Sequence, residues 1–197
     1  MVEFDKIYCL NQPERIDRWE LANAELKRVG IKADWFYSIP DKEPYMSFCL
    51  SQRAMIDDLV KNQYKAALLL EDDVLFRNYQ RIDTYTKGLP ENWDILYLGA
   101  NVTDPKPEKI TDNLFRIRAA WTTHAIAYNN KVFQVIDKYN PETNGMYDDW
   151  LSREVLPNVN AYVIIPMIAW QRPGHSDLWG KWADYTGAFQ HQSKMIK

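Results

Sequence analysis

The run Lys65-Ala-Ala-Leu-Leu-Leu-Glu-Asp-Asp-Val-Leu75 decides the fold of this 197-residue chain. Its five consecutive apolar residues, 66–70, leave no polar position that would face water on either side. A strand of this kind is typical of the middle of a sheet that is covered on both faces. The run then ends abruptly in three acidic residues, 71–73. The stretch therefore predicts an α/β fold in which a buried strand carries an acidic cluster to the edge of the sheet.

The segments on both sides of this strand alternate between strand-like and helix-like patterns. Residues 5–10 indicate a first strand, and Pro13 is expected to open a helix that Gly30 ends. Residues 101–112 indicate an exposed loop, and the tail from residue 171 shows no clear period. No repeat or linker interrupts the alternation, so a single domain is expected. Further strands are predicted at 35–37, 94–98, 115–118, 124–128 and 161–165, and helices around 48–60, 79–89, 132–139 and 147–156.

Size, charge and cysteine content disfavour several classes of protein. A chain of this length can bury a core without a disulfide or a structural metal. Its charge of −3, from 24 basic and 27 acidic residues, disfavours bulk binding to nucleic acid. The two cysteines, Cys9 and Cys49, lie in apolar patterns and are expected to be reduced core thiols. No apolar stretch approaches the roughly 20 residues of a membrane helix, and the N-terminus lacks the pattern of a signal peptide, so a cytoplasmic location is expected.

The acidic triplet is the strongest chemical signal in the sequence. Glu71, Asp72 and Asp73 repel one another unless a cation lies among them. Ligands of open α/β sheets bind outside the carboxyl ends of strands, which is where this triplet falls. Oxygen ligands suit magnesium or manganese, and these ions commonly bridge a carboxylate and a diphosphate. A solvated acidic turn is the simpler interpretation of an isolated triplet, but the apolar segments on both sides favour a functional site.

The same stretch resembles a family signature. Ala67-Leu-Leu-Leu-Glu-Asp-Asp-Val74 is similar to the signature of glycosyltransferase family 25, the lipopolysaccharide-biosynthesis type of glycosyltransferase. Two positions depart from the family pattern, because Phe48 replaces a glycine and Gln52 stands where a histidine usually follows Ser51. Other segments resemble the family in the same order along nearly the whole chain: Ile7-Tyr-Cys-Leu-Asn11, Phe48-Cys-Leu-Ser51, Asp94-Ile-Leu-Tyr-Leu-Gly99, Thr123-His-Ala-Ile-Ala-Tyr128 and Tyr147-Asp148-Asp149.

This resemblance implies a GT-A-like fold, with a Rossmann-type mixed central sheet flanked by helices in a single domain. Residues 1–100 would form the nucleotide-sugar-binding half and residues 101–197 the acceptor-side half. The implied activity is that of a metal-dependent, inverting hexosyltransferase. It would move galactose or glucose from a UDP-sugar to a hydroxyl of a glycan or another acceptor. The implied cofactor is manganese or magnesium, with Asp73 as its direct ligand and with Glu71 and Asp72 contacting the ribose or the metal through water.

Arginines and a late polar turn supply further candidates for the donor and metal sites. On a helix, Arg15 and Arg18 would share a face suited to a diphosphate or a base, with an ordinary charged surface as the alternative. Asn11 is expected either to contact the nucleotide or to cap the helix. His175 and Asp177 follow the last strand and are predicted to complete the metal site, with an ordered loop as the alternative.

Inverting transfer needs a general base within hydrogen-bond reach of the acceptor hydroxyl. Asp148 and Asp149 open a helix-like segment, and a paired site would raise the pKa of one member. The structural alternative is that acidic residues complement the dipole of a helix start. The sequence favours Asp149, and after it Asp148, as the catalytic base.

Two other functions remain open from the sequence. A nucleotidyltransferase also pairs acids with a metal, but its usual glycine-rich phosphate loop is missing from a chain with only 7 glycines. A non-catalytic, glycan-binding remnant of a transferase is the other, because Gln52 replaces the family histidine. The 8 Trp and 12 Tyr would serve such a protein, since these side chains stack on sugar rings. The expected partners are a nucleotide-sugar and a glycan or other hydroxyl acceptor.

Overall fold

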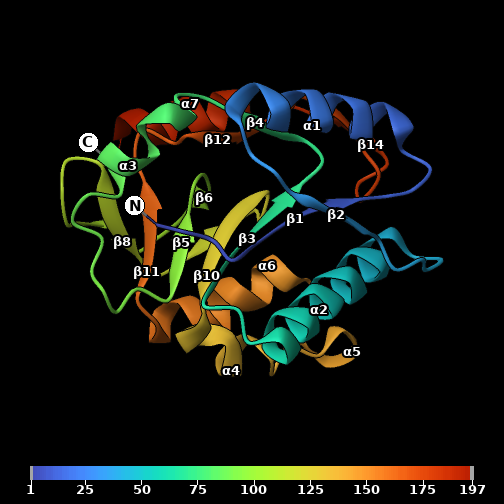
Figure 1. Cartoon of the computed structure of the whole chain (residues 1–197), viewed down its shortest axis with the longest axis horizontal. Helices are drawn as coiled ribbons and strands as arrows, with labels where there is room; N and C mark the ends of the chain where they lie inside the picture. Colours follow the sequence, from blue (N-terminus) through green and yellow to red (C-terminus); the bar gives the residue numbers. More distant parts are fainter. Residues whose placement is uncertain (1, 196–197) are drawn as a thin grey trace.

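An eight-stranded mixed sheet forms the centre of the structure, a computed structural model that describes residues 2–195. Its strands are β1 (Lys6–Asn11), β2 (Asp34–Tyr37), β3 (Ala66–Glu71), β5 (Ile95–Tyr97), β7 (Glu108–Lys109), β8 (Leu114–Ile117), β10 (Ala125–Asn129) and β11 (Ala161–Ile164). Their order across the sheet is β2-β1-β3-β10-β5-β11-β8-β7 (Figure 1).

The sheet has a parallel part and a mixed part, and β10 joins them. β1 is parallel to β2 and β3, and β5 is parallel to β11. β10 is antiparallel to both β3 and β5, between which it lies. A strand from the second half of the sequence is therefore inserted beside one from the first half, so the chain forms a single domain. The predicted α/β fold with a mixed central sheet flanked by helices is confirmed.

Helices cover both faces of this sheet. Figure 1 shows α1 and α7 along one side and α2, α4, α5 and α6 along the other. The α-helices are α1 (Ile16–Val29), α2 (Pro44–Asn62), α3 (Ile82–Tyr85), α4 (Phe133–Ile136), α5 (Pro141–Asn144), α6 (Tyr147–Trp150) and α7 (Thr186–Met195). Short 3-10 or π turns are η1 (Tyr79–Arg81), η2 (Asn130–Val132), η3 (Leu151–Val155) and η4 (Leu156–Asn158). No described helix has the length and apolar character needed to cross a membrane.

Three small two-stranded sheets surround the carboxyl ends of the central strands. β4 (Val74–Phe76) pairs with β12 (Ala169–Gln171), directly after the acidic triplet. β6 (Asn101–Val102) pairs with β9 (Ala120–Trp121), and β13 (Gly174–Ser176) pairs with β14 (Lys181–Ala183) as a hairpin. These pairs frame the site described below.

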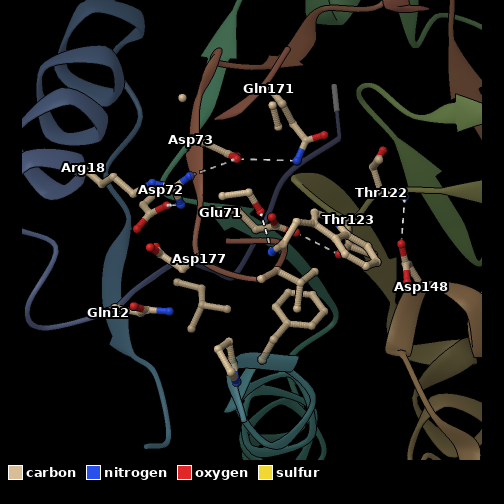
Figure 2. A pocket seen from close by; sticks show the side chains of 18 of the residues that line it. Gln12, Arg18, Glu71, Asp72, Asp73, Thr122, Thr123, Asp148, Gln171 and Asp177 are labelled. Atoms are coloured by element: carbon tan, nitrogen blue, oxygen red, sulfur yellow. Dashed lines mark hydrogen bonds and ion pairs between the residues drawn. The ribbon is translucent and has the colours of Figure 1, made fainter. Parts of the chain in front are cut away.

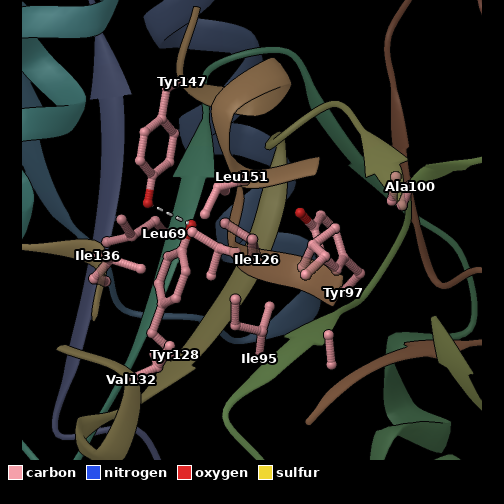
Figure 3. Close-up of a cluster of buried hydrophobic side chains, with 14 of the residues drawn as sticks. Leu69, Ile95, Tyr97, Ala100, Ile126, Tyr128, Val132, Ile136, Tyr147 and Leu151 are labelled. Atoms are coloured by element: carbon pink, nitrogen blue, oxygen red, sulfur yellow. Dashed lines mark hydrogen bonds between the residues drawn. The ribbon is translucent and has the colours of Figure 1, made fainter. Parts of the chain in front are cut away.

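The side chains of β3 explain why its apolar run has no polar position. Leu68 and Leu70 join a cluster that includes Ala22 of α1, whereas Leu69 joins the cluster on the opposite face. Figure 3 shows Leu69 in this second cluster together with Tyr128, whose hydroxyl lies 3.0 Å from that of Tyr147. Each of these leucines is at most 1% exposed. The prediction of a central strand covered on both faces is confirmed.

The first helix begins later than the sequence predicts. Pro13 lies in a turn, because the Arg15 N–H donates to the carbonyl of Gln12 at 2.9 Å, and α1 starts only at Ile16. Arg15 is thus the residue before the helix, and the expectation that it shares a helix face with Arg18 is wrong. Gly30 ends the helix as predicted, in the left-handed conformation with φ of 76°.

Two other segments are more ordered than their patterns indicate. The predicted loop 101–112 contains β6 and β7, and the aperiodic tail contains the β13–β14 hairpin and α7. Strands of two or three residues are too short to show a period of two, which is why the sequence does not reveal them. Cys9 and Cys49 are buried and free, as expected.

Candidate functional site

A cavity of about 490 Å³ opens at the carboxyl ends of β1 and β3. In Figure 2, Glu71 and Thr123 lie between Asp72 and Asp73 on one side and Asp148 on the other. The lining is strongly acidic, because six carboxylates face two guanidinium groups. These side chains are Glu71, Asp72, Asp73, Asp148, Asp149 and Asp177, and Arg18 and Arg172.

Asp72 uses both of its carboxylate oxygens within the protein. Its Oδ1 accepts a hydrogen bond from Arg18 at 2.7 Å, and its Oδ2 accepts one from Asn11 Nδ2 at 2.8 Å. Burial raises the pKa of Asp72, while Arg18 and Asn11 oppose that shift. The three residues therefore tie β1, α1 and the end of β3 together. Asn11 does not cap the helix, because no side-chain hydrogen bond caps α1.

Only one of the two carboxylate oxygens of Asp73 interacts with described protein groups. Its Oδ2 lies 3.7 Å from Arg18 NH2 and 3.5 Å from the Nε2 of Gln171, which donates to it. Its Oδ1 is buried and has no hydrogen-bond partner among the described residues. Burial raises the pKa of Asp73 to about 6, and Asp72 adds to this shift while Arg18 opposes it. A buried oxygen without a partner is unfavourable, so Asp73 has one position ready for a cation or a donor from a ligand.

Glu71 contacts the opposite part of the cavity. Its Oε1 accepts a hydrogen bond from the Thr123 hydroxyl at 2.8 Å. Burial and repulsion by Asp73 raise the pKa of Glu71 to about 8, against the effect of this hydrogen bond. With no cation bound, Glu71 is therefore largely protonated at neutral pH.

Asp148 and Asp149 differ sharply although they are adjacent. Asp148 is partly buried, accepts from the Thr122 N–H at 3.4 Å and the Asp149 N–H at 2.9 Å, and has a pKa raised by burial. The side chain of Asp149 is 46% exposed and forms an ion pair with Arg153 at 3.0 Å. Asp148 is thus the carboxylate held in place beside Glu71 and Thr123, whereas Asp149 is engaged at the surface.

Arg15 and Arg18 attach the β13–β14 hairpin to the start of α1. Arg15 pairs with Asp177 and with Asp17, and Arg18 donates to the carbonyl of His175 at 3.3 Å. Arg18 lines the cavity, but Arg15 does not. Both guanidinium groups are therefore already engaged with protein oxygens, and they position the hairpin over the cavity.

The residues predicted to bind a metal come from two places in the fold. His175 and Asp177 lie on the β13–β14 hairpin, whereas Asp73 follows β3. His175 Nδ1 lies 3.8 Å from Asp177 Oδ1, and Asp177 is paired with Arg15, while Asp73 interacts with Arg18 and Gln171. Within residues 2–195, no group of three or more His, Cys, Asp or Glu side chains is placed to hold a metal ion. Any ion at Asp73 would therefore need ligands from a bound molecule or from water.

Several lining residues were missed by the sequence reasoning. Thr122, Gln171 and Arg172 line the cavity, as do the exposed tryptophans Trp121 and Trp179. Thr122 is in the left-handed region, with φ of 72°, which is unusual for a β-branched residue. No local sequence pattern predicts such a conformation. The aromatic content was the one available signal for the tryptophans.

Gln52 lies away from this cavity. It is buried in α2, 1% exposed, and it is absent from the cavity lining. Its Oε1 has no hydrogen-bond partner in the described part of the chain. Gln52 therefore belongs to the buried face of α2 and not to the side chains that line the cavity.

Comparisons with known proteins agree on the fold. No protein-family model matches the sequence, and no curated protein matches it. The structure resembles a glycosyltransferase involved in the glycosylation of the major capsid of PBCV-1, with a TM-score of 0.50 and 12% identity over 80% of this chain and 79% of that one. It also resembles A197 from STIV, with a TM-score of 0.52 and 10% identity over 90% of this chain and 92% of that one.

These likenesses confirm a GT-A-like fold. Because the sequence identities are so low, these likenesses do not show that this chain has the activity of either protein. The resemblance to glycosyltransferase family 25 therefore stays a prediction from the sequence.

Proposed function

We propose that the protein is a metal-dependent glycosyltransferase that uses a nucleotide-sugar donor. The observation that carries this proposal is the buried Asp73 Oδ1 at the carboxyl end of the central strand, which has no hydrogen-bond partner within residues 2–195. The acidic lining would repel a nucleoside diphosphate unless a cation bound with it. The GT-A-like fold, shared with a solved glycosyltransferase, supports the same reading.

Asp73 is the residue that would hold the cation, through Oδ1. Its hard oxygen fits magnesium or manganese, and the absence of a three-residue metal cluster among residues 2–195 fits an ion shared with the donor. When bound, such an ion acts as a Lewis acid and offsets the charge that develops on the leaving diphosphate. Asp72 would keep Arg18 directed toward this position rather than bind the ion, because both of its oxygens are occupied.

The nucleoside would bind in the part of the cavity next to the parallel strands β1 and β2. Gln12, Ser38 and Phe48 line the cavity beyond β1 and β2 and offer polar groups and one aromatic face. This placement leaves the sugar between Asp73 and the Glu71–Thr123 pair. UDP and galactose or glucose are the donor components that the family resemblance favours.

Asp148 is the residue that we assign as general base. Burial raises the pKa of Asp148 and so strengthens its carboxylate as a proton acceptor, whereas Asp149 is paired with Arg153. Asp148 would remove the proton of the acceptor hydroxyl as its oxygen attacks the anomeric carbon and the bond to the diphosphate breaks. A single displacement of this kind inverts the anomeric configuration.

The test is the release of nucleoside diphosphate from a panel of nucleotide-sugars, with and without manganese. Asp73→Asn should remove manganese-dependent release, because it deletes the charge while preserving shape. Asp83→Asn, a change at an exposed carboxylate outside the cavity, is the control and should act like the wild type.

Three results would contradict the proposal. Unchanged turnover in Asp73→Asn would show that Asp73 does not hold a metal ion needed for the reaction. Formation of a nucleotide-sugar and pyrophosphate from a nucleoside triphosphate and a sugar 1-phosphate, with no release of nucleoside diphosphate from any nucleotide-sugar, would indicate a nucleotidyltransferase. If nucleotide-sugars raise the melting temperature and no turnover follows, the non-catalytic alternative is favoured.

A further inference from the structure

Large aromatic side chains are exposed beside the cavity. The exposed fractions of Trp121, Trp179 and Trp182 are 45%, 59% and 69%. Trp121 and Trp179 line the cavity, whereas Trp182 lies on the same hairpin as Trp179 but outside the lining. Exposed aromatic residues at the edge of a polar cavity offer flat apolar faces to a ligand.

We propose that Trp121 and Trp179 form the acceptor subsite and that the acceptor is an uncharged glycan. This inference rests on the proposed transferase function and adds the class of acceptor. The two residues come from different small sheets, β9 and the β13–β14 hairpin, and each is anchored to side chains of the reaction site.

Trp121 is anchored through the strained residue that follows it. Thr122 adopts a φ of 72°, its N–H donates to Asp148, and the next residue, Thr123, donates to Glu71. A β-branched residue remains in this conformation only where its surroundings demand it. The position of Trp121 is therefore coupled to the two carboxylates closest to the proposed transfer step.

Trp179 is anchored through the hairpin. Its N–H donates to the Ser176 hydroxyl at 3.3 Å, and Gly180, with φ of 61°, completes the turn. Arg15 and Arg18 tie the same hairpin to α1 through Asp177 and the His175 carbonyl. Trp179 is thus presented by a hairpin that the protein holds at two points.

The charges of the lining select the chemistry of the acceptor. Even with Glu71 protonated, the lining has five other acidic side chains against two arginines, which disfavours an anionic glycan. The hydroxyls of a neutral sugar can donate to carboxylates such as Asp148, Asp149 and Asp177, in charge-assisted hydrogen bonds. Its C–H face can stack on tryptophan. Uncharged hexose units satisfy both requirements.

The experiment measures binding of neutral gluco-, galacto- and manno-oligosaccharides, of sialylated and uronate oligosaccharides, and of an oligolysine peptide. Wild type, Trp121→Ala, Trp179→Ala and Trp182→Ala are compared, each with manganese and UDP present. At least one neutral oligosaccharide should bind the wild type and bind each of the first two variants about tenfold more weakly. Trp182→Ala should bind like the wild type. Trp179→Phe should retain most of the affinity, because a ring remains.

Several outcomes would overturn the inference. These are tighter binding of the acidic oligosaccharides or of the peptide, no binding of any neutral oligosaccharide, or equal losses in Trp182→Ala. The melting temperature of each variant with a nucleotide-sugar is measured in parallel. If one of these outcomes occurs while the donor-induced rise survives in all variants, the acceptor inference alone has failed. Absence of that rise in the wild type means that the proposed function has failed.

Discussion

Asp148 and Asp149 show that different surroundings give two identical side chains different chemical properties. Both carboxylates line the cavity, but Asp148 accepts a hydrogen bond from the Thr122 N–H, whereas Asp149 pairs with Arg153. Burial disfavours the charged form of Asp148 and raises its pKa, which makes its carboxylate a stronger proton acceptor than an ordinary aspartate. The sequence favours Asp149 and the contacts favour Asp148, because adjacent residues of the same type cannot be ranked without their contacts.

Asp148→Asn should reduce the transfer rate by about 100-fold or more, the usual contribution of a general base, with little change in donor affinity. Asp149→Asn should stay within several-fold of the wild type. The measurement is kcat for transfer to a saturating acceptor with manganese present. A loss of kcat in Asp149→Asn alone would identify Asp149 as the general base, as the sequence favours.

The end of β5 depends on an unusually close approach between two backbone segments. A Cβ added to Gly99 would lie 1.8 Å from the carbonyl oxygen of Ala169 and 3.0 Å from His124 Nε2. The N–H groups of Ile168 and Ala169 both donate to the carbonyl of Leu98, which holds β12 against this point. Glycine at this position therefore sets how closely the two segments pack, and β12 in turn carries Gln171 to Asp73.

Gly99→Ala should lower the free energy of unfolding by about 3 kcal/mol, because the contact is with backbone that cannot rotate away. Gly187→Ala in α7, where the added methyl meets nothing within 4 Å, should leave stability unchanged or raise it by up to about 1 kcal/mol. Urea unfolding of both variants gives the comparison. Equal stability of the two would show that β12 can shift without penalty.

The whole molecule should become less stable as its acidic cavity ionises. The pKa of Glu71 is raised from an ordinary value of 4.5 to about 8, so the folded state binds a proton that the unfolded state has lost. This contribution is present at low pH and disappears as pH rises through about 8. Asp73, with a pKa of about 6, acts in the same direction. Burial lowers the pKa of His124 to about 4, so this residue has the opposite effect on stability below pH 6.5. The loss of stability with rising pH should therefore be clearest between pH 6.5 and 8.5.

The metal-free protein should therefore lose melting temperature between pH 6.5 and 8.5, and the rise caused by manganese should grow over the same range. Glu71→Gln, which keeps the shape and removes the charge, should flatten the pH dependence of the metal-free protein. Thermal unfolding at three pH values, with and without manganese, tests this. A melting temperature that increases with pH in the metal-free wild type would show that Glu71 is ionised in the folded state.

Local patterns were sufficient for much of the architecture. The uninterrupted apolar run of β3, the glycine that ends α1 and the acidic triplet after β3 all act over a few residues, so their consequences can be deduced from order along the chain. The α/β class, the covered central strand and the placement of the acidic triplet at a strand end follow from them.

The detailed chemistry of the site depends on contacts between distant parts of the chain. Asp72 is engaged by Asn11, 61 residues away, whereas Asp73 keeps one buried oxygen without a hydrogen-bond partner in the described part of the chain. Arg15 meets Asp177 across 162 residues, and β10 enters the sheet between β3 and β5. The roles of these residues follow from burial and from competition for partners in three dimensions, and no spacing in the sequence encodes either.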